Sequence, residues 1–435
     1  MCALSRPSAL IPLFALAVSS QGQTPLTITL QDALARARQY GTQIQSANIN
    51  AALAREDRTQ AKAATLPSLN AFNQFIYTEG NGTPSGVYVA NDGVHVYNEQ
   101  AQVHEELLSF VRHGEIRRAM AAEAVAKAKI EVAQRGLNAT VIQDYYAIVS
   151  AQRRFANAQT SLREADQFLD ISQKQEKGGE VAHADVIKAQ ITRQQRQRDL
   201  GDADLNIEKA KIALGVLIFP DFRTDYAVED DLQQRLDLMP PLPEARAKAA
   251  ASSPDLRVAQ ATIEQSGYEI NVARYAYLPS LGLDFFYGID ANQFAVRTDR
   301  PDAPSRLNLG YSAQVTLNIP VWNWGATRSK IKQAELRQQQ AELDLTLAQR
   351  TLQGSVAAAY REAQTAQAQV DSLRSSSDLS AESLRLTLLR YQAGEANALE
   401  VVDAQTTLAQ ARNAYDDGLA RYRVAMANLQ SLIGN

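Results

Sequence analysis

The 435-residue sequence predicts a mainly α-helical chain with a transmembrane β portion, arranged as a tandem repeat of one structural unit. Three observations support this fold class. They are an internal repeat, two long proline-free stretches of helix-forming residues, and a long segment in which apolar and polar residues alternate. Each unit is expected to contain a helix, a β-hairpin and a long helical hairpin, in that order.

The internal repeat emerges when the sequence is shifted against itself. One shift places Leu66-Pro67-Ser68-Leu69 on Leu278-Pro279-Ser280-Leu281. A slightly larger shift places Gly179-Glu180 on Gly394-Glu395. These matches predict three parts: a first structural repeat at 26–219, a linker at 220–239 and a second structural repeat at 240–434.

The N-terminal residues 1–22 are expected to be a signal peptide. Arg6 precedes an apolar stretch from Ala9 to Val18, and small and polar residues follow that stretch. It is shorter than the ~20 residues that a membrane-spanning helix needs. The single cysteine, Cys2, lies in this segment, so we expect an exported chain with no disulfide and no cysteine for lipid attachment.

The second repeat contains the clearest strand signal. From Leu307 to Ile319, apolar and polar residues alternate without a fault. At ~3.3 Å per residue and a tilt of ~45°, such a strand spans a ~25 to 30 Å apolar band. Strands of soluble sheets usually have only about 5 or 6 residues, which favours a membrane strand. We expect its partner at 279–288 and a polar outward-facing loop at 288–306.

The strands of the first repeat are expected at 67–77 and 94–107, and they are less regular. Glu99 and Glu105 fall on the apolar face of the second strand, where a charge near the membrane centre costs a few kcal/mol. Either the register slips here or these residues lie at the rim. Four strands per chain would leave two edges unpaired in lipid, so closure needs further chains. A dimer would close eight strands and a trimer twelve, and this argument does not choose between them.

The helical hairpins are expected at 113–218 and 325–433. No proline occurs from Ser85 to Phe219 or from Val321 to the end, and Ala, Gln, Leu, Glu and Arg dominate both stretches. Apolar residues repeat at alternating steps of three and four, as in a coiled coil. Glycine-containing turns at 177–181 and 393–397 would divide each hairpin into arms of roughly 60 to 90 Å. A soluble structural coiled coil explains this region alone equally well.

The composition gives little support to enzymatic or nucleic-acid-binding functions. The net charge is −4 and no basic run occurs, so no nucleic-acid partner is expected. The four histidines, His95, His104, His113 and His183, lack a metal-binding spacing, and no phosphate loop, dinucleotide fingerprint or nucleophile elbow is present. We therefore expect no catalytic residue, no metal and no cofactor.

The order and duplication of several short motifs carry a family resemblance. Leu-Pro-Ser-Leu precedes the first strand of each pair, Ile319 to Gly325 (IPVWNWG) follows the last strand, and each glycine turn precedes an acidic residue and a valine, at Asp185-Val186 and Glu400-Val401. From about Leu26 to Gly434 the sequence resembles the TolC-like outer membrane efflux protein family.

The resemblance implies an assembly and a function. It implies a homotrimer that forms a 12-stranded β-barrel in the outer-membrane lipid on a periplasmic α-helical barrel. It also implies a passive exit duct of a tripartite efflux or type I secretion system, which docks to a periplasmic adaptor protein and an inner-membrane pump. The alternative is an exported structural or adhesive coiled-coil protein without a conducting pore. The cargo stays open among drugs, metal ions, proteins and other small molecules.

The resemblance also implies site residues at the periplasmic tip. The adaptor would contact the tip turns, at Gly178, Gly179, Glu180, Gly394 and Glu395. The pore constriction would carry Asp185, Glu400 and Asp403, whose carboxylates would favour cations. Acidic residues in the first turns of a helix also complement its dipole, which explains the same residues without a pore.

Three departures from the family pattern bear on the tip. An acidic residue follows the tip glycine in both repeats, where the family commonly has an apolar or hydroxyl residue. Ala396 stands where some members carry a gating arginine. Lys188 occupies the first-repeat position of Asp403 and would dilute an acidic ring.

Overall fold

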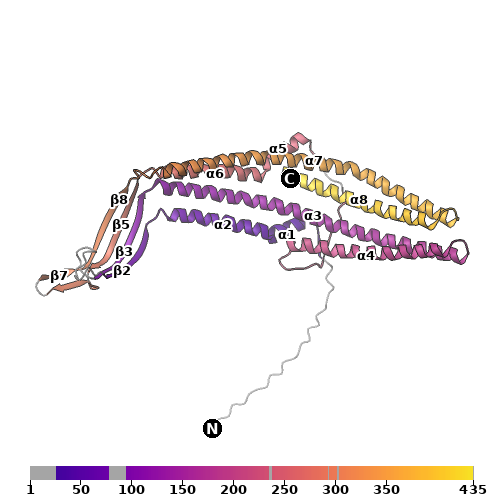
Figure 1. Ribbon diagram of the computed structural model, residues 1–435, viewed down its shortest axis with the longest axis horizontal. Helices are drawn as coiled ribbons and strands as arrows, with labels where there is room; N and C mark the ends of the chain where they lie inside the picture. Colours follow the sequence, from indigo (N-terminus) through magenta and orange to yellow (C-terminus); the bar gives the residue numbers. More distant parts are fainter. Residues whose placement is uncertain (1–25, 78–94, 235–237, 292, 301–302, 435) are drawn as a thin grey trace, which may run out of the picture.

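The computed structural model describes residues 26–77, 95–234, 238–291, 293–300 and 303–434. The signal peptide expected at 1–22 lies outside these residues. The chain is a long rod with a β-sheet at one end and the turns of two helical hairpins at the other (Figure 1). The predicted fold class, a mainly helical tandem repeat of helix, β-hairpin and helical hairpin, is confirmed by the order of the elements.

The main sheet has four antiparallel strands, two from each repeat. Their order is β2-β3-β5-β8. The contact between β3 and β5 joins the two repeats, and β2 and β8 form the two edges of the sheet. The strands span Ser68–Tyr77 (β2), His95–Leu108 (β3), Ser280–Ala291 (β5) and Leu309–Asn318 (β8).

The register of β3 answers the question raised by its two glutamates. Glu99 lies opposite Ile289 and Glu105 lies opposite Leu283, and the pairing with β5 is continuous until a bulge after Glu106. The pairing of β3 with β5 is therefore in one continuous register at both glutamates. Both carboxylates lie on the same face of the sheet as these apolar neighbours. Glu105 is close to the helical end of the sheet, and Glu99 lies towards the opposite end.

The expected polar loop at 288–306 is wrong in part, because much of it is β-structure. Strand β5 continues to Ala291, and β6 (Arg297–Arg300) and β7 (Ala303–Leu307) form a second hairpin beyond the main sheet (Figure 1). The expected strand at 307–319 is divided at Asn308. The side chain of Asn308 donates to the Ala295 carbonyl (2.8 Å) and to Thr298 Oγ1 (2.7 Å), which fastens the second hairpin to the preceding loop.

In the part of the chain that the structure describes, eight helices form the body of the rod. The first repeat contributes α1 (Leu30–Tyr40), α2 (Thr42–Ala63), α3 (Phe110–Lys177) and α4 (His183–Ile218). The second contributes α5 (Leu242–Ser252), α6 (Pro254–Tyr275), α7 (Ala326–Gln392) and α8 (Ala398–Ile433). With 68 and 67 residues, α3 and α7 are each about 100 Å long. Within the described ranges, no helix combines the length and apolarity that crossing a membrane requires.

The helices lie side by side in one curved layer (Figure 1). Near the sheet, the neighbours in order are α2, α3, α6 and α7. Near the tips, the order is α4, α3, α8 and α7. The long helices α3 and α7 therefore run through both halves, and α7 forms one lateral edge of the layer while α2 and α4 form the other.

The middle of the rod holds a core that includes part of the expected linker. Strand β4 (Tyr226–Val228) pairs in parallel with β1 (Leu26–Ile28), ahead of the first helix. The Tyr145 hydroxyl of α3 lies 3.3 Å from the Ile28 carbonyl and 2.8 Å from the Glu229 carbonyl. Around this junction the α-helices bury their apolar stripes, among them Leu137, Val141, Ile148, Leu214 and Ile218. The linker thus forms part of the core of the first repeat.

Candidate functional site at the helical tips

The two tip turns have the same backbone. Gly179 and Gly394 adopt positive φ angles of 79° and 75°. The next residue of each turn donates its N–H back into the preceding helix, from Glu180 to the Gln175 carbonyl (2.9 Å) and from Glu395 to the Arg390 carbonyl (2.8 Å). This backward bond is typical of a helix end closed by a left-handed glycine. The two expected contact turns, with Gly178 beside Gly179, therefore present exposed glutamates in equivalent positions.

Glu400 is engaged in holding the second tip together. Its backbone N–H donates to Asn397 Oδ1 (3.0 Å), and its Oε1 accepts from the Asn397 N–H (3.4 Å), which is a capping box. Its Oε2 lies 3.3 Å from Arg390 Nη1 at the end of α7. The guanidinium of Arg390 also donates to the Glu395 carbonyl (3.1 Å). Arg390 thus neutralises one of the three acids expected at the constriction and braces the turn.

The other two expected constriction residues lie in different surroundings. Asp185 is half-buried in the first turn of α4. Asp403 is exposed on α8, about one turn beyond Glu400, and Lys188 is exposed at the equivalent position of α4. In one chain, the carboxylate of Glu400 is paired with Arg390, that of Asp185 is half-buried and that of Asp403 is exposed. The carboxylate ring belongs to an assembly of chains and stays a prediction.

A buried tyrosine joins the two hairpins just behind the tips. Tyr391, in the last turn of α7, has its hydroxyl 3.1 Å from Ser172 Oγ of α3. Because Ser172 Oγ donates its own hydrogen to the Phe168 carbonyl (2.9 Å), the tyrosine is the donor between the two hydroxyls. Burial raises the pKa of Tyr391, the bond with Ser172 opposes this rise, and the charge of Asp185 adds to it. The hydroxyl therefore remains protonated at neutral pH and can donate.

Helix α3 also caps the end of α7. The Gln175 side chain donates to the carbonyls of Tyr391 (3.3 Å) and Gln392 (3.4 Å), which lie in the last turn of α7. Phe168 packs edge-on against the Tyr391 ring, with centroids 5.2 Å apart. Sequence reasoning missed this cross-contact, because the partners belong to different repeats and are far apart along the chain. The only local signal was a large aromatic residue before the tip glycine.

Further from the tips, polar side chains link α3 to α8. Arg153 bridges Asp230 (2.6 Å) and Asp416 (2.9 Å), and Arg154 pairs with Asp417 (2.6 Å). Closer to the tip, Arg412 donates to Glu164 (2.9 Å). These contacts fix how α8 lies along α3.

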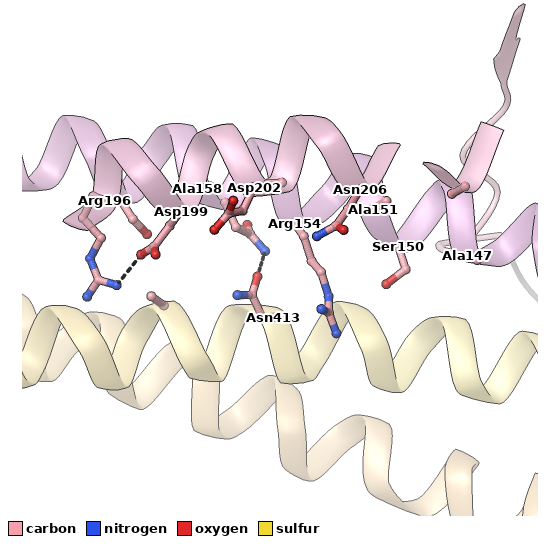
Figure 2. A pocket seen from close by; sticks show the side chains of 15 residues that line it. Ala147, Ser150, Ala151, Arg154, Ala158, Arg196, Asp199, Asp202, Asn206 and Asn413 are labelled. Atoms are coloured by element: carbon pink, nitrogen blue, oxygen red, sulfur yellow. Dashed lines mark hydrogen bonds and ion pairs between the residues drawn. The ribbon is translucent and has the colours of Figure 1, made fainter. Parts of the chain in front are cut away.

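Beside these contacts runs a groove of about 610 Å³ between α3, α4 and α8. Figure 2 shows alanines along it together with polar residues, among them Asn413 and the Arg196–Asp199 pair. The groove therefore combines small side chains with charged ones, of which Arg154, Arg196 and Asp199 already have partners.

At the other end of the rod, one face of the sheet is polar. His104 Nδ1 lies 2.7 Å from Asp284 Oδ1 across the junction of the two repeats. Ser68 and Gln314 flank this pair on β2 and β8, so a polar row crosses all four strands. The opposite face carries Leu69, Phe75, Tyr311, Val315 and Leu317, each more than half exposed in the single chain. The sheet thus has one water-compatible face and one lipid-compatible face.

An open amphipathic sheet that continues into two helical hairpins defines the class of outer-membrane channel subunits. The Campylobacter jejuni CmeC outer membrane channel matches all of this chain and 94% of its own chain, with a TM-score of 0.79 at 17% identity. The open-state Neisseria gonorrhoeae MtrE outer membrane channel matches 93% of this chain and 89% of its own, with a TM-score of 0.74 at 20% identity. These likenesses establish the fold.

Sequence comparisons give the family. The family model "Outer membrane efflux protein" matches residues 245–435. The cobalt-zinc-cadmium resistance protein CzcC of Cupriavidus metallidurans is 24% identical over 329 residues, which cover 74% of this chain and 73% of CzcC. Outer membrane protein OprJ of Pseudomonas aeruginosa is 26% identical over 328 residues, which cover 72% of this chain and 64% of OprJ. These matches confirm the predicted resemblance to the outer membrane efflux protein family.

Proposed function

We propose that three copies of this chain form a passive exit duct through the outer membrane. The duct would serve a tripartite efflux or type I secretion system, with energy supplied by an inner-membrane pump that a periplasmic adaptor connects to the tips. The relatives support both uses, since they include the resistance protein CzcC and the alkaline protease secretion protein AprF of Pseudomonas aeruginosa. The observation that carries the proposal is the sheet, which is amphipathic and ends in two open edges.

The open edges require further chains. Backbone N–H and C=O groups on the outer sides of β2 and β8 have no water to bond in a membrane, so the edges must meet the edges of other copies. Two copies would give eight strands, and side chains fill the interior of a barrel of about that size. Three copies give twelve strands, which is the smallest of these closures with room for a water-filled lumen.

The two faces of the sheet set its orientation. The face with Leu69, Val315 and Leu317 turns towards lipid, and the face with Ser68, His104 and Gln314 lines the lumen. Glu99 and Glu105 lie on the lipid side, away from its centre, where an acidic residue costs least. The barrel would lie in the outer membrane after export by a signal peptide.

The helical hairpins would extend the duct through the periplasm. At about 100 Å, α3 and α7 are long enough to carry the tips far from the membrane. There the exposed turns at Glu180 and Glu395 would meet the adaptor, and the carboxylates of Asp185, Glu400 and Asp403 would line the constriction. The duct would conduct without catalysing a reaction.

Ion conductance of the purified protein in planar lipid bilayers tests this function. We expect step conductances that favour cations, and we expect this cation preference to fall when Asp185, Glu400 and Asp403 are together replaced by their amides, because the negative charge at the constriction is removed. The matched control is Asp378→Asn, an exposed acid elsewhere on α7 that should leave the conductance unchanged. A folded protein without any conductance, even in the triple variant, would favour the coiled-coil alternative without a pore.

A further inference from the structure

A band of excess positive charge lies at the level where the sheet meets the rod. The ends of α2, α3, α6 and α7 lie together there (Figure 1). The nine residues of each helix nearest the sheet contain ten Lys or Arg and four Asp or Glu in total, although the whole chain has a net charge of −4. The excess of positive charge is therefore a local feature of this level.

Both repeats place a cation at the same positions of this band. The internal repeat aligns Lys62 of α2 with Arg274 of α6, and it aligns Arg117 of α3 with Arg328 of α7. Each of the four helices thus carries one of these cations, within about two turns of its end at the sheet. All four side chains are exposed. We call these four residues the collar.

The collar carries more positive charge than its acidic neighbours neutralise. Within the described residues, three collar cations have no acidic partner: Lys62, Arg117 and Arg328. The fourth, Arg274, pairs with Glu335 of α7 at 3.5 Å. The other acid near this level on the lipid-compatible face is Glu105 at the end of β3. The collar therefore has donors available for a negatively charged partner outside the chain.

The collar points away from a polar groove on the opposite side of the helical layer. This groove, of about 470 Å³, lies between α2, α3 and α6, and Asp57, Glu115 and Arg118 contribute to its lining. Glu115 and Arg118 pair with each other there (2.7 Å). At 100° per residue, Arg117 lies about 160° around α3 from Glu115, and Lys62 lies about 140° around α2 from Asp57. The collar therefore belongs to the other side of the layer.

On this side, large apolar residues accompany the collar. Each collar cation has one of them three or four residues away along the chain, and each of these is strongly exposed. They are Leu66 (64%), Met120 (50%), Leu278 (41%) and Trp324 (89%). Apolar side chains next to unpaired cations suit the boundary of a bilayer, where the apolar groups enter the acyl region and the cations reach the phosphates. The collar thus continues the lipid-compatible face of the sheet.

We infer that the collar binds the phosphate groups of anionic phospholipids in the membrane leaflet from which the rod emerges. This inference rests on the proposed function, because it requires the sheet to lie in a bilayer. Lys and Arg side chains without an acidic partner in the chain donate charge-assisted hydrogen bonds to phosphate. A zwitterionic headgroup carries its own ammonium group, which the collar repels, so anionic lipids are preferred. Three copies would present a ring of these sites around the duct.

The protein carries its own probe for this site. The sequence has two tryptophans, Trp322 and Trp324, which lie at this level and are 75% and 89% exposed. Lipids brominated near the headgroup end of their acyl chains quench tryptophan fluorescence on contact. The protein is reconstituted in bilayers of equal parts phosphatidylcholine and phosphatidylglycerol, and only the lipid that carries the bromine is changed.

We expect brominated phosphatidylglycerol to quench more strongly than brominated phosphatidylcholine. Its enrichment beside the collar should be about fivefold, because a Lys or Arg at an anionic surface gains about that factor. Raising the salt concentration should reduce the difference, since the collar is exposed and its charges are screened.

A combined variant removes the unpaired cations and should make the two lipids quench equally. It carries Lys62→Gln, Arg117→Gln and Arg328→Gln. The matched control makes the same change of charge at exposed positions about 30 Å or more from the collar along the helices, and it should keep the wild-type preference. It carries Lys177→Gln, Arg350→Gln and Arg374→Gln.

Conductance of the same preparations separates the lipid site from the duct. Equal quenching by both lipids in the wild-type protein, or a preference that survives in the collar variant, overturns the lipid site, and conductance then shows that the duct is intact. A preference for phosphatidylglycerol in a protein without conductance supports the lipid site and contradicts the duct. A folded protein that neither lipid quenches overturns both, because this level then does not lie in a bilayer.

Discussion

Tyr391→Phe removes a single hydroxyl from the contact between the two hairpins. In the wild-type chain this hydroxyl belongs to a side chain that is 1% exposed, and it donates to Ser172 over 3.1 Å. The variant keeps the ring against Phe168, and Ser172 keeps its bond to the Phe168 carbonyl. No cavity forms and no buried donor is left unpaired, so the loss is the net value of one hydrogen bond, about 1 kcal/mol.

A loss of this size raises the population of separated tips about fivefold, since every 1.4 kcal/mol is a factor of about ten. Hydrogen exchange of the backbone amides in the last turn of α7 measures this population, because these amides exchange when the tip opens locally. The matched control is Tyr360→Phe, a half-buried tyrosine on the same helix whose hydroxyl makes no hydrogen bond within the described residues. Its tip amides should exchange at the wild-type rate.

The double variant tests the origin of the effect. Ser172→Ala removes the acceptor of the same bond, so combining it with Tyr391→Phe should accelerate exchange by less than the product of the two single effects. Independent, multiplicative effects would show that the two hydroxyls do not act through each other. An unchanged exchange rate in Tyr391→Phe alone would refute the hydrogen bond as a tip contact.

Three further predictions concern stability. Arg153→Met leaves two acids without their partner, one of them buried, and should lower the free energy of unfolding in urea by about 3 kcal/mol. The more exposed Arg154→Met should lower it by less than about 1 kcal/mol. Gly394→Ala forces a side chain into a left-handed conformation and should cost about 1 to 2 kcal/mol, whereas Gly136→Ala, in open space on a helix, should stabilise by up to about 1 kcal/mol. Burial raises the pKa of Tyr226 in the folded chain. The contribution of this tyrosine to the free energy of unfolding is therefore complete below the unfolded pKa of about 10 and is lost as the pH rises above it. Tyr226→Phe should make the fall of stability with alkaline pH less steep.

Local patterns in the sequence predicted the repeat, the long helices and the tip turns. Their causes act over a few residues: helix propensity, the absence of proline, and glycine at the left-handed position of each tip turn. The second hairpin beyond the sheet was not predictable in this way. Its polar, proline-containing segment is typical of a loop, and the side chain of Asn308 holds it in place through bonds to Ala295 and Thr298.

The tip illustrates where sequence reasoning reaches its limit. The resemblance indicated the position of Glu400, but its role as a helix cap and partner of Arg390 depends on how the turn folds. Tyr391 and Gln175 act together only because α3 and the end of α7 meet in space. Such contacts between distant parts of the chain leave no periodic signal in a single sequence.

The short parallel pairing of β1 with β4 determines when the first repeat can finish folding. Leu26 pairs with Tyr226, so the N-terminal strand has no partner until just over half of the chain has been synthesised and delivered. Contacts between such distant residues slow folding, because a long loop must close first. For a chain that arrives N-terminus first, the helical hairpin α3–α4 can therefore form early. The middle of the rod closes only when the linker follows, shortly before the second repeat begins to arrive.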